Sequence, residues 1–270
     1  GVQTCALPIC ARALQPLLDA HGAVMDRRRE ATPEVVDALV KADMLRLLLA
    51  RSLGGQEMNL VEFTKTIEAL GYADGSIGWF INQSNVSSAT SAASMPHEAA
   101  QAMFNGPREG LAWGARHNNS KAIRVEGGYR LTGQWSFASG GRHTRLLGAH
   151  SAVQNTDGTP YMRHGRPDDR SFVFLRADAK IIDDWQVLGL RGTGSDSYAV
   201  DNLFVPDALK VELVPVHDRK KPAFELVRVG ETAVFEGVTN GAAQVYAYDL
   251  AITWADGTRT QGRDPYSFWP

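Results

Sequence analysis

Histidines are the side chains in this sequence best suited to bind a metal ion or move a proton, yet their spacing argues against a metal site. The seven are His21, His97, His117, His143, His150, His164 and His217. No pair has the H-x-x-x-H spacing that places two imidazoles on one face of a helix, and no cysteine accompanies them. The sequence therefore predicts no metal site.

A glycine-rich stretch at residues 189–195, GLRGTGS, is the second candidate for chemistry. Backbone amides of such loops can bind phosphate, but this spacing matches neither G-x-G-x-x-G nor G-x-x-x-x-G-K, and no helix is predicted after it. Ser195 also lacks the G-x-S-x-G frame of a nucleophilic serine. Taken alone, the residues favour a tight β-turn here, and the catalytic residues stay unknown.

Composition and charge limit the classes of function to consider. The chain has 270 residues, of which 44% are hydrophobic and 21% charged, and a formal net charge of −2. This length favours more than one domain, and the charge leaves no broad positive field of the kind that binds nucleic acid. The longest apolar run, Met44 to Ala50, is interrupted by Arg46 and is far shorter than a membrane span. We expect a cytoplasmic protein that binds neither nucleic acid nor membrane.

The first part of the chain, residues 11–108, has the period of α-helices. Thr32, Pro33 and Glu34 supply an N-cap, a first-turn proline and a first-turn acid. An apolar stripe with helical spacing follows, formed by Val35, Ala38, Leu39 and Ala42. Further helices are predicted over residues 60–71, over residues 76–79 and after residue 96. These elements predict an N-terminal helix bundle.

Near residue 109 the hydrophobic period changes from 3.6 to two, which indicates strands. A hairpin is predicted over residues 122–133, with Gly127 and Gly128 at its turn. Other strands are predicted at residues 171–175, 185–188 and 199–205, around a polar loop at 155–170. Residues 109–212 are therefore interpreted as an antiparallel β-barrel or sandwich.

A charged break after residue 215 is followed by a second run of predicted strands, over residues 224–229, 234–238 and 245–254, with a hairpin turn at 255–257. We interpret residues 222–270 as a separate small β module. The predicted fold class is thus α+β with several domains.

Three longer phrases occur in a fixed order along the chain: ADGSIGW at residues 73–79, GGYRLTGQWSFASGG at 127–141 and DWQVLGLRGTGSDSYAVDNLFVP at 184–206. Together these motifs resemble the acyl-CoA dehydrogenase superfamily over residues 11–212. Their residues are most similar to those of its two-component flavin-dependent monooxygenase branch. The resemblance implies a reduced flavin, FAD or FMN, delivered by a separate flavin reductase, and a small aromatic or sulfur-containing substrate. An acyl-CoA dehydrogenase proper is the alternative within the superfamily, and a non-catalytic β-rich binding module is the alternative outside it.

The resemblance also implies which residues meet the flavin. Phe137 and Ser139 match an aromatic residue and a hydroxyl residue that lie against the isoalloxazine ring, and a hydroxyl there can donate to the N5 or O4 edge. Trp113 and Gly114 match a second flavin-contacting stretch less closely. The family phrase T-E-x-x-x-G-S-D is replaced by GARHNNS at residues 114–120, which weakens the dehydrogenase alternative. From the residues alone, Phe137 is interpreted as a core residue and Ser139 as a turn residue.

Three residues of the last phrase, Arg191, Thr193 and Ser195, have two interpretations. Either they line the cavity for flavin and substrate, or they simply close a hairpin.

Members of the superfamily continue with a C-terminal four-helix bundle that holds the catalytic acid or base, the adenosine end of FAD and the interface of a homo-oligomer. The sequence has no counterpart of that bundle. We therefore expect a truncated enzyme that binds flavin weakly and turns over no substrate. We also expect Leu47, Leu48 and Leu49, on the apolar face the bundle would cover, to be exposed.

The two ends of the chain resemble other sequences. Residues 222–270 resemble the immunoglobulin-like N-terminal module of glycogen branching enzymes, through FEGV, YDLAITWADG and DPYSF. Trp254, Tyr266 and Phe268 are interpreted there as packing residues rather than sugar platforms. Residues 1–9 resemble a translated sequencing adapter, so residues 1–10 are interpreted as a non-native segment with few contacts. A chimeric chain follows from these resemblances, with a carbohydrate-binding or branching-enzyme accessory fragment as a further alternative function.

Overall fold

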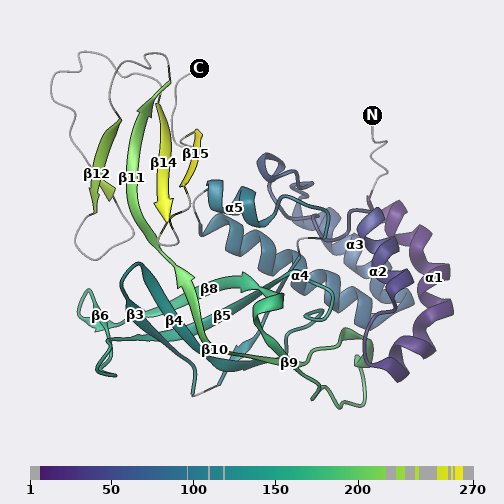
Figure 1. Cartoon of the computed structure of the whole chain (residues 1–270). Helices are drawn as coiled ribbons and strands as arrows, with labels where there is room; N and C mark the ends of the chain where they lie inside the picture. Colours follow the sequence, from purple (N-terminus) through teal and green to yellow (C-terminus); the bar gives the residue numbers. More distant parts are fainter. Residues whose placement is uncertain are drawn as a thin grey trace. The chain divides into compact units, whose positions relative to one another are not determined.

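The computed structural model describes residues 7–95, 97–108, 110–117, 119–216, 223–228, 235–236, 248–254, 257 and 259–263. The chain forms two compact units (Figure 1). The larger takes in residues 1–122, 131–153 and 160–203, and the smaller takes in residues 123–130, 154–159 and 204–270. Within the described ranges, every helix is too short or too polar to cross a bilayer.

The N-terminal part of the larger unit is helical, as predicted. The helices are α1 (Leu7–Arg28), α2 (Pro33–Lys41), α3 (Leu60–Ala73), α4 (Gly75–Ala93) and α5 (His97–Met103), with the 3-10 turn η1 (Arg51–Leu53) between α2 and α3. Side-chain oxygens cap the starts of α2, α3 and α4, because Thr32, Asn59 and Asp74 accept hydrogen bonds from the first-turn amides. Helix α4 is much longer than the predicted segment at 76–79.

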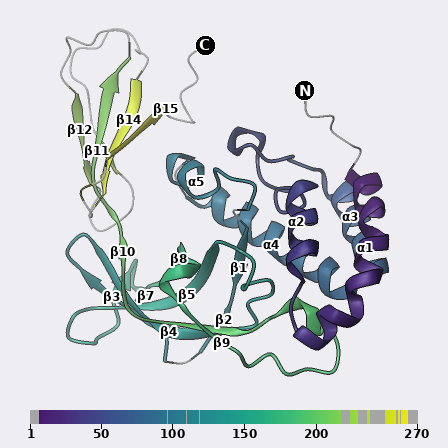
Figure 2. The same cartoon turned by 45° about the vertical axis from the view of Figure 1, so that its right-hand side comes forward.

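Helix α1 begins before the expected boundary of the non-native segment. Its first residue is Leu7, so residues 7–10 form its first turn, and the disulfide-bonded Cys10 packs against the helical core. Residues 1–6 lie outside the described part. Helix α1 packs against α3, and α3 packs against α4, which gives the layer of helices seen in both views (Figures 1 and 2).

The expected exposure of the apolar run at residues 47–49 is wrong. Leu47 and Leu49 are buried, and Leu48 is partly buried against the helical core. Backbone amides of residues 56–58 donate to the carbonyls of Arg46, Leu47 and Leu49, and one side chain, Asn85 of α4, pairs further polar groups of this irregular segment. Its Oδ1 accepts from the amides of Leu47 at 2.7 Å and Leu48 at 3.2 Å, and its Nδ2 donates to the carbonyls of Met44 and Ile81, each at 2.8 Å. A buried backbone needs such partners, so Asn85 allows the leucines to stay inside.

Arg46 lies in the same run, and its buried guanidinium needs hydrogen-bond acceptors as well. The residue is only 6% exposed. Its nitrogens donate to four backbone carbonyls, those of Leu53, Gly54, Phe104 and Gly106. The charge that interrupts the apolar run in the sequence therefore ties the segments around residues 54 and 105 together.

Strands follow from residue 111, which confirms the predicted change from helix to strand and the mixed α+β class. The strands are β1 (Leu111–Trp113), β2 (Ala115–Arg116), β3 (Lys121–Val125), β4 (Gly128–Ser136), β5 (Leu146–Gln154), β6 (Met162–Arg163), β7 (Arg166–Pro167), β8 (Asp169–Leu175), β9 (Lys180–Ile182) and β10 (Ser197–Pro206), with the 3-10 turns η2 (Arg176–Asp178) and η3 (Arg191–Thr193). Eight of these strands form one sheet in the order β1-β5-β3-β4-β10-β9, with β2 on β4 and β8 on β5. The sheet curls into a half-barrel (Figure 2).

Three predictions for this sheet are wrong in detail. Strands β1 and β5 pair in parallel, so the sheet is not wholly antiparallel. Residues 185–188 form a loop instead of a strand, because the backbone carbonyls of Trp185 and Val187 accept side-chain hydrogen bonds from arginines rather than ladder bonds. The predicted polar loop at 155–170 contains the short ladder of β6 and β7.

The smaller unit contains a five-stranded sheet in the order β13-β12-β11-β14-β15. Its strands are β11 (Ala208–Pro215), β12 (Phe224–Arg228), β13 (Phe235–Glu236), β14 (Tyr248–Trp254) and β15 (Arg259–Arg263). The predicted boundary between residues 212 and 222 falls inside this sheet, because β11 pairs with β14 from Ala208 opposite Trp254 to Pro215 opposite Tyr248. Tyr266, Phe268 and the expected turn at residues 255 and 256 lie outside the described residues.

The pairing of residues 44–48 by one amide gives a prediction about stability. Asn85→Ala removes all four hydrogen bonds and leaves buried backbone groups unpaired, which costs about 1–3 kcal/mol for each strongly affected group. We expect the free energy of unfolding to fall by at least about 2 kcal/mol in urea titrations followed by circular dichroism. The matched control is Asn82→Ala on the same helix, whose side chain takes no part in holding residues 44–48. Equal stability of the two variants would contradict the assignment.

Candidate functional site

A cavity of about 610 Å³ lies in the larger unit between α4 and the curled sheet. Its walls come from α4, β1, β2, β5, the loop after β4 and the loop around η3. The lining residues are Trp79, Gln83, Trp113, Gly114, Ala115, Arg116, Phe137, Ser139, His150, Trp185, Leu190, Thr193 and Ser195. Five of these thirteen residues carry aromatic rings, and three carry hydroxyl groups that lie within hydrogen-bond distance of one another.

Six of the seven residues singled out in the sequence line this cavity. They are Trp113, Gly114, Phe137, Ser139, Thr193 and Ser195. The seventh, Arg191, points elsewhere: its Nε donates to the carbonyl of Asp26 on α1, and its Nη1 donates to the carbonyl of Val187, each at 2.9 Å. Arg191 therefore anchors the η3 loop to α1 instead of lining the cavity.

The segment after β4 has an unusual backbone that presents Phe137. This residue has a φ of +62°, which is rare for a large side chain. The conformation is held by the neighbouring loop, because Ala138 N donates to Asp196 O at 3.1 Å and Gly140 N donates to Thr193 O at 2.8 Å. As a result Phe137 is 63% exposed at the cavity, and its ring stands nearly perpendicular to the Trp185 ring at 6.0 Å between centroids.

Gly140 is required where this segment meets α4. Its φ is +73°, and a Cβ at this position would lie 2.0 Å from the ring of Phe80. The first glycine of SFASGG is therefore explained by close packing and a left-handed backbone rather than by a generic turn.

The opposite wall is built from Trp113 and His150, whose rings meet edge to face at 4.6 Å. Gly148 leaves room for Trp113, since a Cβ there would lie 2.1 Å from the indole. Gly114 serves a similar purpose, because a Cβ on it would come within 2.7 Å of Trp135 and Tyr198. Trp113 is thus held in a defined position by the packing behind it.

Four side chains form a continuous row of hydrogen bonds along one side of the cavity. Trp79 Nε1 donates to Ser139 Oγ at 3.0 Å, and Ser139 Oγ lies 2.8 Å from Ser195 Oγ. Ser195 Oγ lies 2.7 Å from Thr193 Oγ1, which donates to the carbonyl of Leu190 at 2.8 Å. The three hydroxyl residues are nearly fully buried, at 6%, 4% and 1% exposure. The row joins α4, the loop after β4 and the η3 loop.

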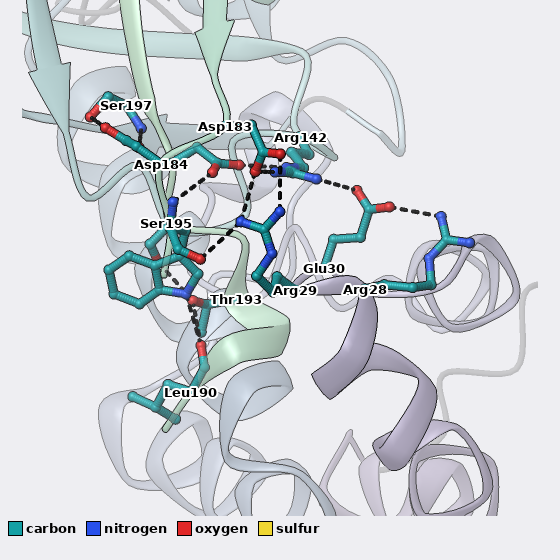
Figure 3. A network of polar contacts seen from close by, with 12 residues as sticks. Arg28, Arg29, Glu30, Arg142, Asp183, Asp184, Leu190, Thr193, Ser195 and Ser197 are labelled. Atoms are coloured by element: carbon teal, nitrogen blue, oxygen red, sulfur yellow. Dashed lines mark hydrogen bonds and ion pairs between the residues drawn. The ribbon is translucent and has the colours of Figure 1, made fainter. Parts of the chain in front are cut away.

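Behind the cavity, an ion-pair network fixes the same loops (Figure 3). Arg142 reaches three carboxylates: those of Asp196, of Asp183 at 2.8 Å and of Glu30 at 3.2 Å. The hydrogen bond with Asp196 raises the pKa of Arg142. Asp196 is 2% exposed and also accepts from the amide of Trp185 at 3.1 Å. The network therefore sets the position of the Trp185 backbone at the cavity edge.

Two further contacts complete the support of this edge. Arg29 donates to the carbonyl of Trp185 at 3.2 Å and pairs with Asp183 at 2.8 Å. Asp184 accepts from the amide and the hydroxyl of Ser197 at 2.8 and 2.6 Å. Each of the consecutive residues 183–185 is thus held, residues 183 and 185 by Arg29 and residue 184 by Ser197.

The sequence alone did not single out several cavity residues, notably Trp79, Gln83, His150 and Trp185. A signal existed for two of them, because Trp79 ends the phrase ADGSIGW and Trp185 begins the phrase at residues 184–206. Gln83 and His150 had no such signal. Their place at the cavity follows only from the packing of α4 and β5 beside it.

No model of a known protein family matches the chain. The chain is 33% identical over 204 residues to the oxygenase subunit HsaA of a flavin-dependent monooxygenase from Rhodococcus jostii (strain RHA1), which covers 72% of this chain and 49% of that protein. It is 26% identical over 269 residues to a pigment production hydroxylase from Rhodococcus erythropolis, which covers 93% of this chain and 66% of the hydroxylase. Among solved structures, XiaF from Streptomyces sp. in complex with FADH2 and glycerol has a TM-score of 0.69 and 26% identity, covering 74% of this chain and 49% of XiaF.

The relatives of this chain are flavin-dependent monooxygenases and hydroxylases. This confirms the resemblance to the monooxygenase branch that the three phrases indicated. The chain spans about half the length of the curated relatives it matches.

His143, next to Arg142, gives a prediction about pH. Burial lowers the pKa of His143 to about 4, and no hydrogen-bond partner meets its buried Nε2. In the unfolded chain the imidazole of this residue is protonated below about pH 6.5, whereas in the folded chain it is protonated only below about pH 4. Stability from this group is therefore complete above pH 6.5 and is lost as the pH falls toward 4, by up to about 1.4 kcal/mol per pH unit.

We expect His143→Leu to flatten the fall in the free energy of unfolding between pH 7 and pH 5, measured by urea titration at each pH. The matched control is His164→Asn, at an exposed left-handed position that asparagine tolerates. The control should keep the wild-type slope. A slope unchanged by His143→Leu would show that other groups cause the pH dependence.

Proposed function

We propose that this chain supplies the flavin-facing cavity of a two-component flavin-dependent monooxygenase, as its oxygenase component. The observation that carries the proposal is the convergence of Trp113, Gly114, Phe137, Ser139 and the Thr193–Ser195 turn on one aromatic cavity. The first and last of these residues lie 82 positions apart in the sequence. The names of the relatives support the same function.

The cavity has the properties that a flavin ring requires. Its volume lies within the roughly 300–1,000 Å³ of small-molecule sites, and five of its thirteen lining residues are aromatic. Phe137 offers a flat ring for stacking, and Ser139 offers a hydroxyl at the edge. A bound reduced flavin supplies the electrons that activate molecular oxygen for hydroxylation. The complex of XiaF with FADH2 supports a flavin cofactor, FAD or FMN, for this chain as well.

The residues of this chain bind and orient the ring but leave it open to water. Phe137 is 63% exposed and Trp79 is 45% exposed, so the cavity as described has one unprotected side. Reduced flavin that meets oxygen in open solvent is oxidised without product. We therefore propose that the 270-residue chain binds flavin weakly and is inactive in hydroxylation.

Partners and location follow from the same proposal. A separate flavin reductase delivers the reduced cofactor, a small aromatic or sulfur-containing molecule is the substrate, and full-length proteins of this type form homo-oligomers. The proposed location is the cytoplasm. Acyl-CoA dehydrogenation is less well supported, because the relatives are monooxygenases and hydroxylases.

The resemblance of residues 222–270 to a branching-enzyme module and that of residues 1–9 to an adapter remain hypotheses. The similarity to the Rhodococcus erythropolis hydroxylase over 93% of the chain favours another origin for the smaller unit, as part of an oxygenase. The domain boundaries at residues 10, 108 and 212 are likewise proposals.

Titration of the chain with oxidised FMN and FAD, followed by quenching of flavin fluorescence, tests the proposed function. We expect Phe137→Leu to weaken binding about three- to tenfold, because leucine keeps an apolar side chain but loses the ring stacking of about 0.5–1.5 kcal/mol. The matched control is Met162→Leu, an exposed apolar side chain away from the cavity. Equal affinities of Phe137→Leu and wild type would place the flavin elsewhere.

A further inference from the structure

The row of hydrogen bonds beside the cavity has a fixed direction. Thr193 Oγ1 donates its one proton to the Leu190 carbonyl, so it must accept from Ser195. Ser195 thereby uses its own proton and must accept from Ser139. Ser139 in turn accepts from the indole of Trp79. The protons all point from α4 toward the η3 loop.

The Ser139 hydroxyl is bound on both sides by protein groups. Its oxygen accepts from the Trp79 indole, and its only proton points at Ser195 rather than into the cavity. Each of the three hydroxyl protons in the row is thus committed to a neighbouring oxygen. Ser139 can donate to a molecule in the cavity only if its proton turns away from Ser195.

We infer that Ser139 is a two-position proton donor, and that Trp79 and Ser195 are positioning residues that control it. The inference rests on the proposed function, since the ligand it takes is a planar heteroaromatic ring with an acceptor atom at its edge, as in flavin. Without a ligand, Ser139 donates to Ser195. With a ligand, the hydroxyl rotates about its Cβ–Oγ bond and donates to the ring edge, while the Trp79 indole keeps the oxygen in place.

The inference predicts effects of opposite sign for neighbouring serines. Ser195→Ala removes the acceptor that competes for the Ser139 proton, so flavin should bind about two- to fivefold more tightly. Ser139→Ala removes the donor, so flavin should bind about three- to tenfold more weakly. Trp79→Phe keeps an aromatic ring but releases the Ser139 oxygen, and it should also weaken binding. A purely structural role for the row would weaken binding in all three variants.

Two measurements on the 270-residue chain test the inference. The first is the titration of each variant with oxidised FMN, with Ser151→Ala as the matched control, because Ser151 is a buried serine outside the cavity whose hydroxyl has no partner. The second needs no flavin: the indole Nε1–H signal of Trp79 in a ¹H–¹⁵N spectrum, assigned by its loss in Trp79→Phe. This signal should move strongly in Ser139→Ala, which removes its acceptor, and little in Ser195→Ala.

The outcomes separate the inference from the function on which it rests. Tighter binding in Ser195→Ala, weaker binding in Ser139→Ala and an indole shift confined to Ser139→Ala support the two-position donor. Weaker flavin binding in Ser195→Ala, or an indole signal that stays at the same position in Ser139→Ala, overturns the two-position donor. The proposed function still stands in that case if the wild-type chain binds flavin. Absence of flavin binding by the wild-type chain overturns the proposed function and this inference together.

Discussion

The buried carboxylate of Asp196 is the constraint on which the candidate site depends. A carboxylate that is 2% exposed needs charged and hydrogen-bonding partners, and it finds them in Arg142 and in the amide of Trp185. Removing one partner of such a pair costs about 3–5 kcal/mol. Because Arg142 also reaches Glu30 and Asp183, this arginine fixes the loop after β4, the connection between β9 and β10 and the segment after α1 against each other.

That fixed frame explains how strained residues are tolerated at the cavity. Phe137 and Leu190 both have left-handed backbones, with φ of +62° and +53°, and each such residue costs about 1–3 kcal/mol. Both lie within loops that the Asp196 pair and the backbone bonds between residues 138–140 and 193–196 hold in place. The left-handed backbone of Phe137 directs its ring to the cavity. The ion pair of Asp196 and these backbone hydrogen bonds offset the cost of that conformation.

Local signals in the sequence were sufficient for the start of α2 and for the hairpin, but not for the length of α4. Thr32 and Pro33 start α2 as predicted, and the Gly127 turn joins β3 and β4, because capping and turn chemistry act over a few residues. The phrases at residues 127–141 and 184–206 also indicated the cavity. Long-range contacts had no local signal: the pair of Arg142 with Glu30 spans 112 positions, and the burial of Leu47 depends on Asn85, 38 positions away. The loop at 185–188 was mistaken for a strand because alternating side chains do not show where its carbonyls bond.

The central claim is that a flavin ring occupies the cavity lined by Phe137, Ser139 and Trp113. A crystal structure of the chain soaked with oxidised FMN tests this claim most directly. We predict electron density for the isoalloxazine ring against Phe137, with an edge nitrogen or oxygen within hydrogen-bond distance of Ser139 Oγ. Well-ordered flavin bound outside this cavity, with the cavity itself empty, would contradict the account.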